Sequence, residues 1–358
     1  MATVYNIIKK VRFTITKKRS SGMSIQNDLT RQLNLRIPVI MAPMFLVSNE
    51  KMMKAAINNG IMGVFPTLNF RKEGALEDII DNLHLELLSQ QGKPGNFGVN
   101  LIVQKSNPLY KRHLEICIQR KVPFYITSLG NPEEVIQRAH EYGGKVYCDV
   151  TNLIHAEKCA SLGCDGFIAV GAGAGGHAGP HPNYILIPSL KNKYPQIPVA
   201  AAGGIATGEA ILSMLACGAS GVSIGTRFIA SVEGGVPDDY KNAVVDYGMT
   251  DIIMTERLSG TPCAVINTPA AQKLGTKQNW FEKMMSRNAR TKKYFKMLVN
   301  IRGLKLLEDA VKPGNYNNLW CAGQSVEMIH DILPCKDIIN HLERETLEAM
   351  KKLEGIIK

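Results

Sequence analysis

The sequence predicts an α/β protein whose core is a (β/α)8 barrel, the TIM-barrel architecture, with a helical cap inserted after strand eight. Two observations support this prediction: eight short apolar runs alternate with helical patterns, and glycines end the last three runs. These glycines are Gly175 and Gly176, then Gly203 and Gly204, then Gly225. The spacing between these glycine-bearing strand ends is about the length of one βα unit. Eight alternating units favour a closed parallel barrel over an open doubly wound sheet.

Each expected strand is short and almost continuously apolar, which is typical of strands covered on both faces. Helical patterns separate most of the runs, for example at 132–142, 154–162 and 206–218. In chain order the eight runs are Ile37–Ala42, Ile61–Phe65, Phe97–Ile102, Val122–Thr127, Lys145–Val150, Phe167–His177, Val199–Gly204 and Gly221–Thr226. Residues 27–230 therefore contain all eight expected barrel strands.

Three segments complete the expected domain organisation. Residues 1–26 form a basic N-terminal extension, and residues 27–230 together with 313–358 form the barrel. Residues 231–312 interrupt the alternation and are interpreted as the helical cap over the barrel mouth. Their apolar stripe consists of Trp280, Phe281, Met284, Met285, Tyr294, Phe295 and Met297.

The formal net charge of +11 is concentrated in two segments of the chain. Residues 1–26 hold six basic residues and no acidic one, and residues 273–305 hold ten basic residues and one acidic residue. Neither has the motif pattern or the zinc-ligand spacing of nucleic-acid modules, so no nucleic-acid partner is expected. The basic segments are either solvated helical faces or surfaces that attract an anionic substrate or an acidic carrier protein.

Composition is that of a globular protein, with 45% hydrophobic and 20% charged residues. No apolar run approaches the ~18 residues of a membrane span. The eight cysteines show no CxxC pair, which indicates buried thiols in a reducing compartment and no metal site. Residues 1–26 loosely fit a transit peptide but lack the apolar core of a secretory signal. We therefore expect a cytoplasmic protein. The sequence leaves its oligomeric state open, and a homodimer is one alternative.

The glycines after strands seven and eight predict a phosphate site. A residue without Cβ permits positive φ and lets bare N–H groups approach a ligand. The loops after these two strands are where such barrels hold a phosphorylated cofactor. Candidate ligands are Gly203, Gly204, Gly225 and Thr226, the last at the start of a short helix whose N-terminus favours an anion. The alternative is that these glycines only permit tight strand–helix packing.

His177 is the candidate catalytic residue. It follows Gly175 and Gly176 at the end of the sixth run, so we expect it at the carboxyl rim of the barrel. Imidazole titrates near neutral pH, which suits removal of a proton from a carbon acid. His181, between Pro180 and Pro182, is interpreted as a loop residue.

Other residues end neighbouring strands at the same rim. Asn100 closes the third run and is suited to bonding a ring edge or a substrate oxygen. Asp149 closes the fifth, where it either orients a base or caps the loop. The remaining candidates, expected against a flat ring, are Ala42, Pro43 and Met44 after the first run and Gln324 on the returning chain.

These motifs, taken in order, resemble those of the nitronate monooxygenases over residues 30–340. They are Ala42–Met44, Gly98–Asn100, Gly175–His177, Ala202–Ile205, Gly225–Phe228, Ser259–Pro262 and Ala322–Gln324. The resemblance implies FMN as cofactor, with its phosphate at the four candidate ligands named above and His177 as catalytic histidine. It implies flavin contacts from residues 42–44, Asn100, Gly176 and Gln324, and puts Ser259 on the substrate side. Gly173 stands where the family usually carries glutamate.

The function implied by the resemblance is oxidation of alkyl nitronates or related carbon acids by FMN and O2, which yields a carbonyl compound and nitrite. An FMN-dependent enoyl-acyl-carrier-protein reductase that uses NAD(P)H is the alternative, because it is similar over the same motifs. In that case the basic 273–305 segment would dock the acidic carrier protein. A flavin-binding protein without catalysis is a third interpretation, and the intact Gly-Gly-His argues against it.

Overall fold

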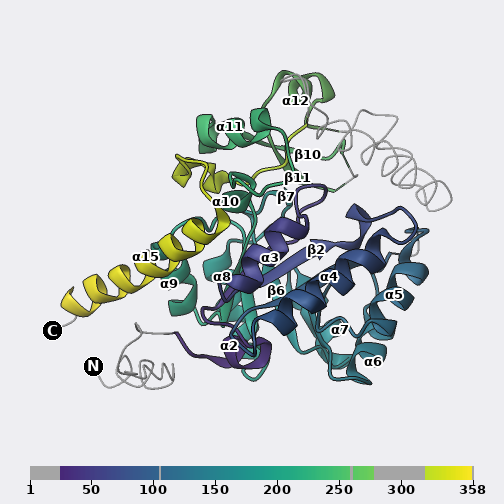
Figure 1. The fold of residues 1–358 in the computed structure, drawn as a ribbon. Coiled ribbons are helices and arrows are strands. Elements are labelled where there is room, and N and C mark those ends of the chain that lie inside the picture. Colours follow the sequence, from purple (N-terminus) through teal and green to yellow (C-terminus); the bar gives the residue numbers. More distant parts are fainter. Residues whose placement is uncertain (1–24, 105, 259–260, 278–318, 357–358) are drawn as a thin grey trace.

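The computed structural model describes residues 25–104, 106–258, 261–277 and 319–356, and its central feature is a closed barrel (Figure 1). Eight parallel strands pair in the order β1-β2-β3-β4-β5-β6-β8-β9, and β9 returns to β1 through Val222 and Val39. The strands are β1 (Val39–Met41), β2 (Met62–Pro66), β3 (Asn96–Ile102), β4 (Phe124–Ser128), β5 (Lys145–Val150), β6 (Gly166–Val170), β8 (Val199–Ala202) and β9 (Gly221–Ile224). Each falls on one predicted run, so the (β/α)8 barrel is confirmed.

Helices cover the outside of the barrel between successive strands (Figure 1). They are α3 (Glu50–Asn58), α4 (Ala75–Ser89), α5 (Tyr110–Gln119), α6 (Glu133–His140), α7 (Leu153–Ser161), α8 (Asn183–Lys193) and α9 (Gly208–Ala216), with a single 3-10 turn, η1 (Thr67–Asn69), before α4. In α6, Val135, Ile136 and Ala139 are buried on one face, while acidic residues begin the helix and basic residues end it. That charge distribution complements the helix dipole.

The amino end of the barrel is closed by α2 (Asp28–Leu33), which lies below the strands in Figure 1. Leu29 and Leu33 of α2 join the cluster of side chains that fills the barrel interior. At the same end, the Tyr147 hydroxyl donates to Gln32 Oε1 at 2.6 Å. The interior is therefore a packed core, and in barrels of this kind the active site lies at the carboxyl end.

A small antiparallel sheet lies over the carboxyl end (Figure 1). Its strands are β10 (Ile252–Thr255), β11 (Cys263–Ile266) and β7 (Gly176–His177), in that order. The same region contains α10 (Thr226–Ile229), α11 (Asp238–Asp246), η2 (Met249–Asp251) and α12 (Pro269–Leu274). In its described part, the segment expected to form the cap contains helices together with the two strands β10 and β11. Residues 278–312, with the aromatic and methionine stripe, lie outside the described residues.

The chain returns to the barrel along this sheet, in a segment we call the return segment (residues 319–333). Ile266 N donates to Trp320 O at 2.8 Å, and Cys321 pairs with Val265. The segment includes η3 (Gln324–Met328) and leads into α15 (Cys335–Ile356), which packs mainly on α9. The return segment therefore joins the cap sheet to the barrel rim.

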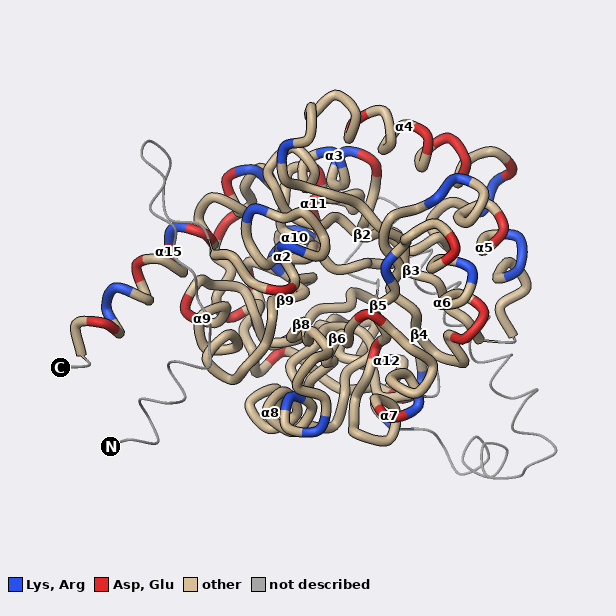
Figure 2. The backbone as a smooth tube through the Cα atoms, turned by 90° about the horizontal axis from the view of Figure 1, so that it is seen from below, with Lys and Arg blue, Asp and Glu red and all other residues tan. Residues whose placement is uncertain are grey.

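Charged residues of both signs are distributed over the outer helices when the barrel is seen from below (Figure 2). All eight cysteines are described and carry free thiols. None of the described helices is long and apolar enough to cross a bilayer. Most of the two basic segments, residues 1–26 and 273–305, lies outside the described ranges.

Candidate active site

The ends of the first and last barrel strands bring three candidate residues together. Ala42 N donates to Ile224 O at 2.9 Å, directly before Gly225. A Cβ placed on Gly225 would lie 3.7 Å from both Ala42 Cβ and Met44 Sδ. Residues 42–44 and Gly225 therefore form one wall at the carboxyl end of the barrel, as the sequence predicts.

The turn after β8 is made of two glycines in the left-handed region, with φ of 103° at Gly203 and 76° at Gly204. A Cβ on Gly203 would lie 2.5 Å from Ala174 N, and one on Gly173 would lie 3.0 Å from Gly204 N. Residues with side chains would be strained or would clash there. The loop after β6 and the turn after β8 consequently pack backbone against backbone.

The N–H groups of this turn are available to a ligand. Among the described residues, neither Gly203 N nor Gly204 N has an acceptor in the protein. Unpaired N–H groups in a loop at the end of a barrel strand are typical of anion sites. The turn therefore fits a phosphate group.

The start of α10 adds a hydroxyl to the same region. Thr226 is buried, and its Oγ1 accepts a hydrogen bond from Gly323 N at 3.0 Å. The hydroxyl hydrogen of Thr226 remains to be donated to another acceptor. Gly323 also packs against Gly173 and Gly175, where a Cβ on Gly323 would meet Gly173 O at 2.5 Å. Gln324 follows directly, at the first position of η3.

His177 lies in the cap sheet rather than in a barrel strand. The sequence predicts a sixth strand that continues to His177. In the structure β6 ends at Val170, and His177 pairs with Cys263 in β11. Glycines at 171, 173, 175 and 176 break the strand, and Gly176 has φ of 67°. The cap sheet, through this pairing, fixes the backbone of the histidine at the mouth.

The environment of His177 favours a neutral imidazole. The residue keeps contact with solvent, but desolvation of the ring by the surrounding protein lowers the pKa of His177 below its ordinary value. The neutral ring is therefore favoured at pH 7, and a neutral ring can accept a proton. The role of His177 as a base stays a prediction.

Asn100 and Asp149 belong to one hydrogen-bonded chain across the ends of β3, β4 and β5. Asn100 Nδ2 donates to Ile126 O at 3.0 Å and to Ser128 Oγ at 2.8 Å. The Ser128 hydroxyl in turn donates to Asp149 Oδ2. Both hydrogens of the Asn100 amide are thus committed to the protein, which leaves Oδ1 as the atom for a ligand donor.

Burial raises the pKa of Asp149 to about 6, against the opposing effect of the Ser128 hydrogen bond. A carboxyl group with this pKa exists in both protonation states near neutral pH. Among the described residues, the Asp149 carboxylate accepts from Ser128 and from no backbone N–H of the loop that follows β5. Both roles considered for Asp149, at the site and as a loop cap, stay predictions.

Several residues of the site escaped the sequence reasoning. Ser128 links Asn100 to Asp149, but in the sequence it is only a polar residue that follows the fourth apolar run. Arg227 is buried, and its guanidinium donates to Asp331 O at 3.0 Å and pairs with the Asp331 carboxylate. Asn183, at the start of α8, binds the backbone of the 203–204 turn. Ser259, the predicted substrate-side residue, lies outside the described residues.

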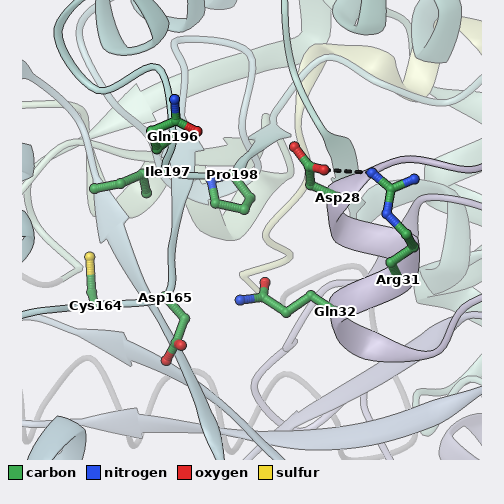
Figure 3. A pocket seen from close by; sticks show the side chains of 8 residues that line it. All are labelled: Asp28, Arg31, Gln32, Cys164, Asp165, Gln196, Ile197 and Pro198. Carbon is green, nitrogen blue, oxygen red and sulfur yellow. Dashed lines mark hydrogen bonds and ion pairs between the residues drawn. The ribbon is translucent and has the colours of Figure 1, made fainter. Parts of the chain in front are cut away.

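A polar pocket of about 490 Å³ lies at the opposite end of the barrel (Figure 3). It is bounded by Asp28, Arg31 and Gln32 of α2, by Cys164 and Asp165 before β6, and by Gln196, Ile197 and Pro198 before β8. Asp28 and Arg31 pair with each other at 2.6 Å, and Asp165 binds Lys145 at 2.9 Å. Most of its charged groups are therefore already paired within the protein. Barrel enzymes place their chemistry at the other end.

The chain forms a closed (β/α)8 barrel, and the carboxyl end of that barrel carries amides, an imidazole and a buried carboxyl group. These features together are those of a barrel enzyme. Residues 26–345 match the model of the nitronate monooxygenase family, and the chain belongs to this family. Together with the relatives below, this membership makes the chain a flavin-dependent oxidoreductase. The resemblance seen in the sequence motifs is thereby confirmed.

Three known proteins show how the chain relates to others. It is 26% identical to a (3aS,4S,5R,7aS)-5-hydroxy-7a-methyl-1-oxo-octahydro-1H-indene-4-carboxyl-CoA dehydrogenase of Rhodococcus jostii, over 93% of this chain and 98% of that protein. It is 27% identical to a probable nitronate monooxygenase of Staphylococcus aureus, over 68% of this chain and 78% of the relative. The solved structure of FabK from Thermotoga maritima matches with a TM-score of 0.78 and 30% identity, over 93% of this chain and all of that one.

Proposed function

We propose that the protein binds FMN at the carboxyl end of the barrel and oxidises alkyl nitronates or related carbon acids with O2, giving a carbonyl compound and nitrite. One observation supports this above the others. A single loop carries Gly173, which packs on the Gly203–Gly204 turn, and, four residues on, the neutral His177. A phosphate site and a base are thus connected by a few residues of backbone.

The residues present fit a flavin mononucleotide. Gly203, Gly204, Gly225 and Thr226 would hold the phosphate through N–H groups and a hydroxyl. The ring would lie among Ala42, Pro43, Met44, Asn100, Asp149, Gly175, Gly176 and Gln324, and the space beside Gly176 is open because a Cβ there would meet nothing within 4 Å. The bound flavin would supply the redox chemistry. For a nitroalkane, the electron pair that leaves the carbon reduces O2 to hydrogen peroxide, and water supplies the oxygen of the carbonyl compound as nitrite leaves.

The protein's own groups would handle protons and charge. Neutral His177 takes a proton from the carbon beside the nitro group of a neutral nitroalkane, or its N–H holds a nitronate that is already an anion. Asp149, with its pKa raised to about 6, donates a hydrogen bond when protonated. Ser259 remains the proposed substrate-side residue.

The variant His177→Asn tests the base role. We expect the rate with a neutral nitroalkane to fall by ~10²–10⁴, because a positioned general base contributes about that factor. Oxidation of the preformed nitronate should fall less, since its proton is already gone. His181→Asn, a loop histidine on the same segment, is the control and should keep the wild-type rates. Undiminished turnover of the neutral nitroalkane by His177→Asn would rule the base role out.

A second candidate function is an NAD(P)H-dependent enoyl-thioester reductase. The likeness to FabK and to a dehydrogenase of a CoA compound over nearly the whole chain favours it. The two functions differ in the electron donor, so anaerobic mixing separates them. Rapid bleaching of the flavin by a nitronate but not by NADPH supports the nitronate oxidant, and the reverse supports the reductase.

A further inference from the structure

Asn183 is the residue that binds the carbonyl groups of the glycine turn. It is the first residue of α8 and is only 8% exposed. Its Nδ2 donates to Ala202 O at 3.1 Å and to Gly203 O at 3.0 Å. One amide group thus binds two successive peptide units from the side of α8.

Ala202 O also accepts from Gly171 N at 2.9 Å, whereas among the described residues Gly203 O accepts from Asn183 alone. Asn183 therefore supports the direction of the Gly203 N–H and, as the one donor to Gly203 O, sets the direction of the Gly204 N–H. In a trans peptide the carbonyl oxygen and the following N–H point in opposite directions. Because Ala202 O and Gly203 O are drawn toward Asn183, the N–H groups of Gly203 and Gly204 point away from it. These are the two N–H groups that meet no protein acceptor among the described residues.

Asn183 keeps this position at a cost. Its Oδ1 is buried without a hydrogen-bond partner, and a Cβ on Gly171 would lie 2.4 Å from it. An unpaired buried acceptor is unfavourable, and an apolar side chain would avoid it. The hydrogen bonds of the Nδ2 group offset the cost of the unpaired Oδ1, because Nδ2 is the only polar atom of this side chain with partners in the described residues.

We propose that Asn183 is a positioning residue that orients the Gly203 and Gly204 N–H groups for an anionic phosphate monoester without touching it. The proposal rests on the cofactor site of the proposed function and explains how that site is ready before the ligand arrives. Orienting donors in advance reduces the ordering needed on binding. The effect should therefore be specific to ligands that carry the phosphate.

The test compares FMN with riboflavin, which lacks the phosphate, by quenching of flavin fluorescence on titration with the apoprotein. Asn183→Ala should weaken FMN binding by about 10–100-fold, as expected for losing the alignment of one or two charge-assisted hydrogen bonds. Riboflavin binding should change by less than about threefold. Asn183→Ser keeps one donor and should recover part of the loss, and it replaces the alanine variant if that variant does not fold.

Asn152→Ala is the matched control. Asn152 caps α7, one βα unit earlier, where its side chain accepts from His155 N at 2.9 Å and makes no contact with the glycine turn. Its FMN-to-riboflavin ratio should stay at the wild-type value. Equal loss of both ligands in the Asn183 variants, or no loss of FMN, would overturn the role of Asn183 while wild-type FMN binding stands. Failure of the wild type to bind FMN would overturn the cofactor site and this inference together.

Discussion

Asp149 is a residue of the candidate site whose ionisation near neutral pH affects stability. Burial raises the pKa of its carboxyl group to about 6 from 3.8, so the folded protein favours the protonated form. The resulting contribution to stability is complete below about pH 4 and is lost as the pH rises to about 6. At neutral pH and above, the ionised carboxylate destabilises the fold.

The variant Asp149→Asn should therefore be more stable than the wild type at pH 8, by about 1–3 kcal/mol, since one pKa unit corresponds to about 1.4 kcal/mol. Asparagine is neutral, of the same shape, and still accepts from Ser128. Urea unfolding at pH 8 and at pH 4 measures the difference, and the gain should vanish at pH 4. A variant that is less stable at pH 8, or equally stabilised at both pH values, would contradict this assignment.

At the residue scale, the sequence could predict residues whose neighbours carry a local pattern. Gly203, Gly204 and Gly225 stand at the ends of apolar runs, and His177 follows two glycines. Ser128, Asn183 and Arg227 could not be predicted in the same way. Each acts on a backbone or side chain far along the chain, and such a contact leaves no periodicity in the residues around it.

The elements that fix the site are α10 and the return segment. Thr226 accepts from Gly323 N, and Arg227 binds both the carbonyl and the carboxylate of Asp331. The side chain of Arg227 is 8% exposed, while that of Asp331 is 52% exposed. The return segment, with Gln324, is thus tied to the helix whose N-terminus faces the predicted phosphate.

Arg227→Ala should lower the free energy of unfolding by about 2–4 kcal/mol, because it removes a buried guanidinium that is hydrogen-bonded to Asp331 and leaves the space of its packed methylene groups unfilled. The matched control is Arg31→Ala, which removes an exposed ion pair with Asp28 and should cost less than about 1 kcal/mol. Chemical denaturation of both variants measures the two values. Equal costs would contradict a special role for the Arg227 contacts.

The barrel strands were predictable as elements, and the cap sheet was not. Eight apolar runs of strand length, separated by helical patterns, determine the barrel because each unit is local. β7 has two residues, and it exists only because β11 pairs with it from more than eighty residues away. The placement of His177 in a cap strand, rather than at the end of β6, follows from that long-range pairing.

At the scale of the whole molecule, the two ends of the barrel have different roles. α2 and the interior cluster close the amino end, where the pocket of Figure 3 lies and where Asp28 and Arg31 form an ion pair. The glycine turn, Thr226 and Asp149 lie at the other end of the barrel, and His177 belongs to the cap sheet over that end. The cytoplasmic location and the homodimer remain predictions from the sequence.

A crystal structure of the protein with FMN tests the central claim most directly. The account predicts density for the phosphate within about 2.7–3.2 Å of the N–H groups of Gly203 and Gly204 and beside Thr226, with the isoalloxazine ring at the barrel mouth next to His177. A phosphate bound elsewhere, or a ring turned away from the histidine, would contradict it.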